Sequence, residues 1–307
     1  MKKEGVKLCD LVDSTNLQSI VNEIKYIATL MVNDFDHALL EQTCADIKML
    51  FEGNFPGYRA SNTKYHDLEH TSAVVLAASR LMHGAFTEGH SFSAKTILLG
   101  LLGAIFHDIG YIQTDSDVNG SGAKYTIGHE ERSIRFLKEY LSQKSFSEQD
   151  IEDCTHIIMS TILSLEIKDI PFRSNDIELL GKILGSADLL AQIADREYLE
   201  KLFMLFKEFE EADMPGYGSE LELLQKTQNF YQYVALQRLN EEFENVAAFM
   251  RFHFKNRWDL DRDLYQESII TNINYLKTVV DSCDESYGCY LKYLRRGGLA
   301  EKLNQNK

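Results

Sequence analysis

A histidine and an aspartate stand side by side at the end of a strongly apolar run. The run begins near Thr96, and His107 and Asp108 close it within residues 106–110, Phe-His-Asp-Ile-Gly. Burying either polar group without a partner would cost roughly 2–7 kcal/mol, and more for a charge. Imidazole and carboxylate are both metal ligands, so we predict that the partner of this pair is a metal ion.

Four further residues of these types lie on or beside the apolar stripes of other predicted helices. They are His70, His129, His156 and Asp188. Together with His107 and Asp108 they provide six donor groups, which suffice for two divalent metal ions. Neutral imidazole with carboxylate suits Fe, Mn, Zn, Co or Ni better than Ca, and Mg is a further candidate. Asp108, placed between imidazole-rich segments, is the predicted bridging ligand.

Five motifs follow one another along the chain in the order H, HD, H, H, D. They are His70, residues 107–110 (His-Asp-Ile-Gly), residues 129–131 (His-Glu-Glu), His156 and residues 186–188 (Ser-Ala-Asp). This series resembles that of the HD-domain metal-dependent phosphohydrolases. Residues 65–71 (Tyr-His-Asp-Leu-Glu-His-Thr) resemble the Tyr-His-Asn-x-x-His-Ala opening of cyclic nucleotide phosphodiesterases, and residues 186–189 resemble their Cys-Ala-Asp-Leu. The likeness covers roughly residues 60–210.

The resemblance implies roles for individual residues. His70, His107, Asp108 and Asp188 would hold the first metal ion, with Asp108 also reaching the second, and His66 would be the proton donor. Bound together, two ions lower the pKa of a shared water toward about 7 and clamp the phosphoryl oxygens during displacement. The implied substrate is a small phosphoester, above all a cyclic nucleotide, with base specificity left open.

The sequence departs from the phosphodiesterase pattern at two positions. Asp67 stands where those enzymes have Asn, and Ile112 where they have a further His. His129 and His156 instead fit the two-histidine second site of other HD proteins, such as the HD-GYP enzymes and the HD-fold di-iron oxygenases.

Three functions therefore remain open. A metal-dependent phosphohydrolase is the leading hypothesis, and a di-iron oxygenase is the first alternative. The second alternative is a regulatory module that binds metal or nucleotide without turnover, because a fold does not by itself establish a function. His66 also has an alternative role, since it could orient neighbouring residues rather than donate a proton.

Apolar residues recur at three-to-four spacing over most of the chain, and only three prolines occur. The pattern predicts an all-α protein, and the resemblance implies a compact multi-helix HD-domain bundle. We expect a single domain over residues 1–307, with the metal-binding core at about 60–210 and helical extensions on both sides. Ser14 or Thr15 is expected to cap the first helix, and His66 and His70 to share the first turns of another. The remaining helices are expected at residues 96–108, 128–141, 149–162, 176–193, 195–211, 220–254 and 265–280.

Composition narrows the partners and the compartment. The net charge of −15 would repel a nucleic-acid polymer or an anionic membrane over most of the surface. The longest apolar run is about half of the roughly 20 residues that a membrane span needs. No export signal is visible, and five cysteines without a CxxC pair do not suggest a disulfide framework. We therefore expect a cytoplasmic protein, without a prediction of its oligomeric state.

Two basic residues and one acidic segment invite weaker interpretations. Lys124 and Arg196 could meet a phosphate, although isolated basic residues on such a protein are usually solvated. Residues 115–120 match the first half of a calcium-binding loop, but Thr126 occupies the place of the required bidentate Glu. We therefore predict a plain loop at residues 113–124, close to the entrance of the site.

Overall fold

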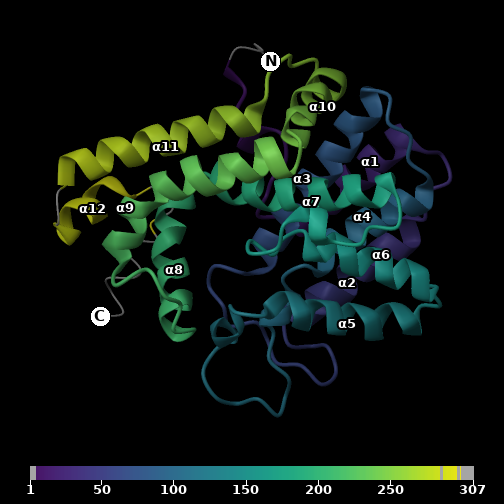
Figure 1. Cartoon of the computed structure of the whole chain (residues 1–307), viewed down its shortest axis with the longest axis horizontal. Coiled ribbons are helices and arrows are strands. Elements are labelled where there is room, and N and C mark those ends of the chain that lie inside the picture. Colours follow the sequence, from purple (N-terminus) through teal and green to yellow (C-terminus); the bar gives the residue numbers. More distant parts are fainter. Residues whose placement is uncertain (1–4, 284–285, 296–297, 299–307) are drawn as a thin grey trace.

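Helices make up the architecture of this protein, as the sequence predicts (Figure 1). The computed structural model describes residues 5–283, 286–295 and 298. Within these residues there is no strand, and the one isolated β-bridge joins Tyr58 and Thr114. The α-helices are α1 (Leu17–Met31), α2 (His37–Phe51), α3 (Leu68–Thr87), α4 (Ala94–Phe106), α5 (His129–Gln143), α6 (Glu148–Met159), α7 (Asn175–Ala194), α8 (Tyr198–Glu211), α9 (Glu220–Phe230), α10 (Phe249–Trp258), α11 (Leu264–Cys283) and α12 (Tyr287–Tyr293).

Two long helices, α3 and α7, pack against each other in the middle of the molecule (Figure 1). Helix α4 packs on both, α1 and α10 pack on α3, and α11 packs on α7. Close approach to α10 requires Gly84, because a Cβ there would lie 1.9 Å from the Phe249 carbonyl oxygen. Most residues of α3, α4 and α7 are buried, so these helices form the core. His70 projects from α3 and Asp188 from α7, and His107 and Asp108 follow the end of α4.

The start of α3 differs from the prediction in one respect. The helix begins at Leu68, so His70 lies in its first turn, whereas His66 precedes the helix. Asp67 is the N-cap, with an extended backbone and a side chain that accepts a hydrogen bond from the His70 amide at 2.9 Å. A capping residue ends the helical run in the N-terminal direction, and therefore the placement of His66 on the helix was wrong.

A short 3-10 turn, η3 (Ile109–Tyr111), follows His107 and Asp108 and is fixed to α5. The Gly110 amide donates to Ser133 Oγ at 2.9 Å, and Arg132 Nε donates to the Gly110 carbonyl at 2.6 Å. A Cβ on Gly110 would lie 1.9 Å from the His129 carbonyl oxygen. These contacts hold the segment that carries Asp108 against the helix that carries His129.

The polar loop at residues 113–124 is packed by its own side chains. Gln113 is buried and donates through Nε2 to the carbonyls of Asp117 and Asn119, at 3.2 and 3.1 Å. Asn62 Nδ2 donates to Gln113 Oε1 at 2.9 Å. Lys124 pairs with Asp117 at 2.5 Å. Lys124 therefore forms its ion pair within the loop, and the Asp117 carboxylate is paired with this lysine. Both contacts agree with the prediction of a plain loop.

Three other expectations need correction. Asn16, rather than Ser14 or Thr15, caps α1, because its side chain accepts from the Ser19 amide. Residues 220–254 form several helical pieces, among them two π-helical segments. Cys283 and Cys289 form a disulfide, whereas Cys9, Cys44 and Cys154 are free.

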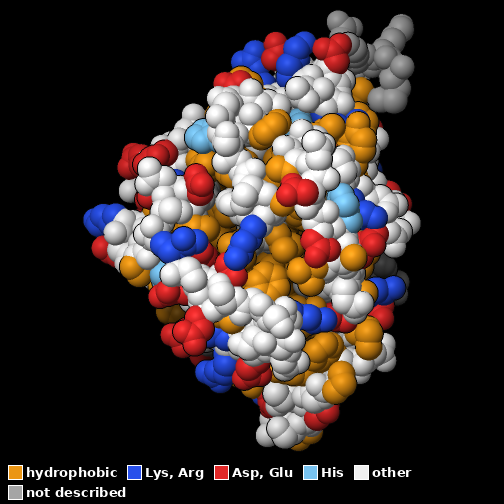
Figure 2. All heavy atoms as spheres, turned by 90° about the vertical axis from the view of Figure 1, so that its right-hand side faces the viewer, with side chains coloured by type: hydrophobic (Ala, Val, Ile, Leu, Met, Phe, Trp, Pro, Cys, Tyr) orange, Lys and Arg blue, Asp and Glu red, His pale blue; other side chains and the backbone are white. Residues whose placement is uncertain are grey.

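The surface and the helix lengths bear on the predicted partners. Figure 2 shows one face of the molecule, with hydrophobic side chains in a central hollow and charges of both signs around it. In the described part of the chain, no helix has the length and apolar character needed to cross a membrane.

The contact between η3 and α5 predicts the effect of a single methyl group. Gly110→Ala should lower the free energy of unfolding by about 3 kcal/mol, the upper end of the usual cost of overpacking, because its Cβ would collide with the backbone of His129. Gly288→Ala in α12 is the control, since a Cβ there has nothing within 4 Å. Denaturant titration measures both variants. Equal stability of the two would contradict a tight junction at Gly110.

Candidate metal centre

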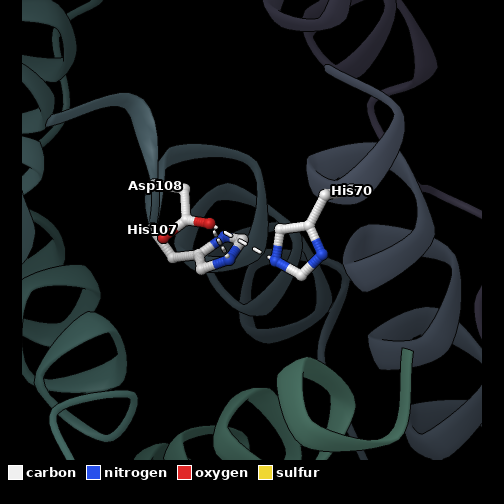
Figure 3. Close-up of side chains that lie close together, drawn as sticks. All are labelled: His70, His107 and Asp108. Atoms are coloured by element: carbon white, nitrogen blue, oxygen red, sulfur yellow. Dashed lines mark ion pairs between the residues drawn. The ribbon is translucent and has the colours of Figure 1, made fainter. Parts of the chain in front are cut away.

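The predicted ligands meet around the carboxylate of Asp108. Figure 3 shows the imidazoles of His70 and His107 turned toward it. His70 Nε2 lies 3.3 Å and His107 Nε2 lies 3.2 Å from Asp108 Oδ2. One ligand atom from each of these three residues lies within 4.8 Å of the others. Asp188 joins them from α7, with Oδ1 at 3.3 Å from His70 Nε2 and 3.8 Å from His107 Nε2.

The second oxygen of Asp108 faces a different imidazole. His129 Nε2, at the start of α5, lies 3.3 Å from Asp108 Oδ1. One carboxylate thus has its two oxygens directed at imidazoles from separate elements. This is the arrangement that a carboxylate bridging two metal ions requires.

Hydrogen bonds on the outer side of the rings set which nitrogen faces inward. His107 Nδ1 lies 2.8 Å from the Ala104 carbonyl, and His129 Nδ1 lies 2.9 Å from the Thr126 carbonyl. A carbonyl can only accept, so each Nδ1 donates and, in the neutral ring, Nε2 presents its lone pair toward Asp108. Metal-binding histidines are commonly oriented in this way.

The surroundings of one buried nitrogen show whether these residues fit a metal ion. His107 Nε2 is inaccessible to solvent and has no hydrogen-bond partner among the described residues, although Asp108 Oδ2 is only 3.2 Å away. An inaccessible nitrogen left in this state is costly unless another group completes its interactions. The donor set of imidazole and carboxylate fits a divalent transition metal.

The charges of the site are strongly coupled. Burial lowers the pKa of His70, but the carboxylates of Asp108 and Asp188 outweigh it and raise that pKa to about 10. Burial likewise opposes charging of His129, yet Asp108 raises its pKa to about 9. Burial would raise the pKa of Asp108, whereas His107 and its other imidazole neighbours hold it well below its ordinary value. Without a metal ion, protons on the imidazoles therefore neutralise the carboxylates.

His66 lies beside this cluster, and a residue far along the chain orients it. Its Nδ1 is 2.5 Å from Glu208 Oε2 on α8, while Glu208 Oε1 accepts from the amides of Lys64 and Tyr65 at 2.8 and 2.7 Å. The rings of His66 and His70 are 5.8 Å apart. His66 Nε2 has no hydrogen-bond partner among the described residues, so it is the nitrogen available to a ligand.

Two residues of the site were missed from the sequence. Glu208 is buried and lies 142 positions from His66, so no local spacing connects them. Tyr111 stacks on both His66 and His129, with ring centroids 4.2 and 4.4 Å apart. Its position three residues after Asp108 was the one available signal.

His156 is not joined to the cluster by any ion pair or ring contact among the described residues. It lies on α6, is buried, and packs edge-on against Phe172 at 6.3 Å. Its Nδ1 is inaccessible and has no hydrogen-bond partner in the described part of the chain. Its role as a ligand of the second metal ion stays a prediction.

Comparison with protein-family models assigns this chain to a family. A model described as Npun_R2479-like matches residues 48–248, about two thirds of the sequence. The chain belongs to the Npun_R2479-like family. The matched region contains His66, Glu208 and every predicted metal ligand, so the site lies within the part that defines the Npun_R2479-like family. The description of this family names no activity, and no curated protein matches the chain.

The raised pKa values predict that metal binding releases protons. At pH 8, His70 and His129 of the metal-free protein should be protonated, with pKa values of about 10 and 9, and a metal ion needs them neutral. Calorimetric titration with Mn²⁺ in two buffers of different ionisation enthalpy should show about one to two protons released per protein. Asp108→Asn should lose this release together with the affinity. Asp261→Asn, at an exposed ion pair with Arg251, is the control. Binding without proton release would contradict the coupling.

The same shifts predict how the stability of the metal-free protein depends on pH. The folded pKa values of His70 and His129 lie above the unfolded value of 6.5, so their contribution is complete below pH 6.5. It should be lost as the pH rises through about 9 to 10. Urea unfolding in chelator from pH 6 to 10 measures this loss. Asp108→Asn should flatten the profile, and an unchanged slope in that variant would count against the assignment.

Proposed function

We propose that this protein is a metal-dependent phosphohydrolase of the HD type, which cleaves a small phosphoester, above all a cyclic nucleotide phosphodiester. The observation that carries the proposal is the shared carboxylate of Asp108. Its Oδ2 faces His70 and His107, and its Oδ1 faces His129. Two divalent ions held there would supply an activated water and would clamp the phosphoryl oxygens.

The proposal assigns the protein's own residues to holding these ions. His70, His107, Asp108 and Asp188 would bind the first ion, and Asp108 with His129 would bind the second. His156 is the further predicted ligand of the second ion. Burial of Asp108 and His107 excludes water from one side of the site and strengthens its electrostatic interactions.

His66 would protonate the leaving oxygen. Glu208 fixes the ring through Nδ1, which leaves Nε2 to carry the transferred proton. Tyr111, stacked on His66, restricts the orientation of the ring further. A positioned general acid of this kind contributes typically about 10²–10⁴-fold to a rate.

Attraction of an anionic substrate would depend on the metal ions. Lys124 is paired with Asp117, and Lys201 is paired with Asp195 at 2.6 Å and with Glu69 at 3.2 Å. With these lysines engaged and a net charge of −15, bound divalent ions are the strongest positive charges that the site can offer. A small phosphoester fits such a site better than a nucleic-acid polymer does.

A di-iron oxygenase is the second candidate, and His129 is the observation that favours it. An imidazole on the second oxygen of Asp108 furnishes the second metal site with nitrogen as well as oxygen donors. Iron in the purified protein together with an oxygen-dependent product would identify this activity. Turnover of a phosphoester with an iron-free metal complement would exclude it.

The phosphohydrolase proposal predicts a loss that depends on the leaving group. His66→Gln should lower kcat for cyclic AMP or cyclic GMP by about 10²–10⁴-fold, because the alkoxide leaving group needs a proton. On bis(p-nitrophenyl) phosphate, whose leaving group is stable as an anion, the loss should be much smaller. His90→Gln, at an exposed turn, is the matched control and should keep full activity.

Chelator and Asp108→Asn should abolish turnover of both substrate types. Glu208→Gln should reduce activity on the cyclic nucleotide more than on the nitrophenyl ester, since it acts through His66. Full activity in chelator would overturn the metal-dependent reaction. An equal loss on both substrates in His66→Gln would overturn the role of His66 as proton donor.

A further inference from the structure

Two buried histidines outside the metal centre meet where α10 packs on α3 (Figure 1). His83 on α3 is 1% exposed, and His253 on α10 is 0% exposed. Their Nδ1 atoms are 3.1 Å apart, and their rings meet edge to face with centroids 5.0 Å apart. His83 directly precedes Gly84, whose contact with Phe249 leaves no room for a Cβ. The two rings therefore belong to the packing that holds α10 in place.

The hydrogen bond between the two rings depends on where their protons are. One Nδ1 donates its proton, and the other accepts through its lone pair. A proton added to the accepting ring would place two N–H donors opposite each other and break this bond. A proton added to the donating ring would instead place a charge in a buried site, which is costly without a counter-charge. The surroundings of the pair decide whether such a counter-charge exists.

The charges around the pair are positive. Two guanidinium groups act on it, that of Arg80 from α3 and that of Arg257 from α10. Glu23 on α1 is engaged by Arg257 through two contacts of 3.2 Å, and Tyr265 on α11 accepts a hydrogen bond from Arg80 at 3.1 Å. Among the described residues, no carboxylate and no charged group of α4, α7 or η8 (Val246–Ala248) shifts the pKa of either histidine. No counter-charge is therefore present for an imidazolium.

Burial and the guanidinium groups lower both pKa values. Burial is the larger cause for His83, and with Arg257 it lowers the pKa from 6.5 to about 4. Burial, Arg80 and the neighbouring ring hold the pKa of His253 well below 6.5. His253 Nε2 is inaccessible and has no hydrogen-bond partner in the described part of the chain, so a charged ring would have an N–H without an acceptor. In the packed state both rings are therefore neutral at pH values where an ordinary histidine is charged.

Helix α10 has few groups that hold it on the core. It spans ten residues, of which Met250, His253 and Phe254 are buried. A helix with so few buried side chains is the kind of element that opens locally while the rest of a protein stays folded. Opening would expose both imidazoles to water and restore their ordinary pKa values, so protons favour the open state.

We propose that the His83–His253 pair is a pH-sensitive contact, which holds α10 on α3 while both rings are neutral and releases α10 when they take up protons. The contribution of the pair to this packing is complete above pH 6.5 and is lost as the pH falls toward 4. This direction is opposite to that of His70 and His129. The inference does not depend on the proposed activity, because neither ring is a predicted metal ligand.

Hydrogen–deuterium exchange of the full chain in chelator measures the opening of α10. After correction for the intrinsic exchange rate, protection of the α10 amides should fall about a hundredfold between pH 7.5 and 5.5. The reason is that two imidazoles are neutral in the closed state and have a pKa of 6.5 in the open state. The amides of α2 are the internal reference and should lose much less protection. Unchanged protection of α10, or an equal loss in every helix, would overturn the proposal.

Two variants remove the titrating rings one at a time. His253→Asn keeps a polar atom near the position of Nδ1 but takes up no proton, so the fall in α10 protection should be about tenfold. His83→Asn should behave likewise, and the double variant should show no fall. His90→Gln is the matched control, because His90 is exposed and contacts Phe249 of α10 without belonging to the pair. It should keep the hundredfold fall.

The readout is the ratio of protection at the two pH values, because a substitution in the packing weakens α10 at both. The two single variants decide the question if the double variant does not fold. An undiminished hundredfold fall in either of them would overturn the proposal. Asp108→Asn should keep the hundredfold fall, so failure of the metal centre and failure of this contact are separable.

Discussion

The carboxylate of Asp108 is the interaction on which the arrangement of the site depends. It is 5% exposed, and a buried carboxylate needs positive charge or hydrogen-bond donors nearby. Imidazoles on three elements meet this need: His70 from α3, His107 from the end of α4 and His129 from α5. The three elements must therefore converge on one point. Two hydrogen bonds of Gly110, to Ser133 and from Arg132 on α5, hold the segment that carries Asp108 against α5.

The same carboxylate needs a balancing positive charge, either from protons on the imidazoles or, in the proposed function, from a divalent ion. Protons on His70 and His129 balance the negative charge when no ion is bound, as their raised pKa values indicate. In the proposed function, a divalent ion would supply that balance instead of the protons. Because Nδ1 of His107 and of His129 is held by a backbone carbonyl, Nε2 is the nitrogen that would exchange a proton for the proposed metal ion. The backbone therefore sets the orientation of these two rings.

Much of this could be predicted from the sequence, because it depends on local patterns. Apolar periodicity correctly identified an all-helical chain and placed His107 and Asp108 at the end of the buried helix α4. The placement of His66 failed, since periodicity alone does not identify which polar residue caps a helix. Asp67 is an aspartate at a cap position, where asparagine would serve equally well, so its departure from the phosphodiesterase pattern is compatible with the fold. Glu208 could not be found, because its contact with His66 depends on how α8 packs against the start of α3.

Charged side chains are buried in different surroundings at the N-terminal end and in the middle of α3. At the N-terminal end, His70 faces the carboxylates of Asp108 and Asp188, which raise its pKa to about 10. Ten residues on, Arg80 has aromatic rings and a tyrosine hydroxyl around it, and no ion pair in the described part of the chain. The protein has 47 acidic residues against 32 basic ones, so a scarcity of carboxylates does not explain this. Glu69 and Asp195 are instead paired with Lys201, and Glu267 with Arg262, while Nε and Nη2 of Arg80 have no hydrogen-bond partner among the described residues.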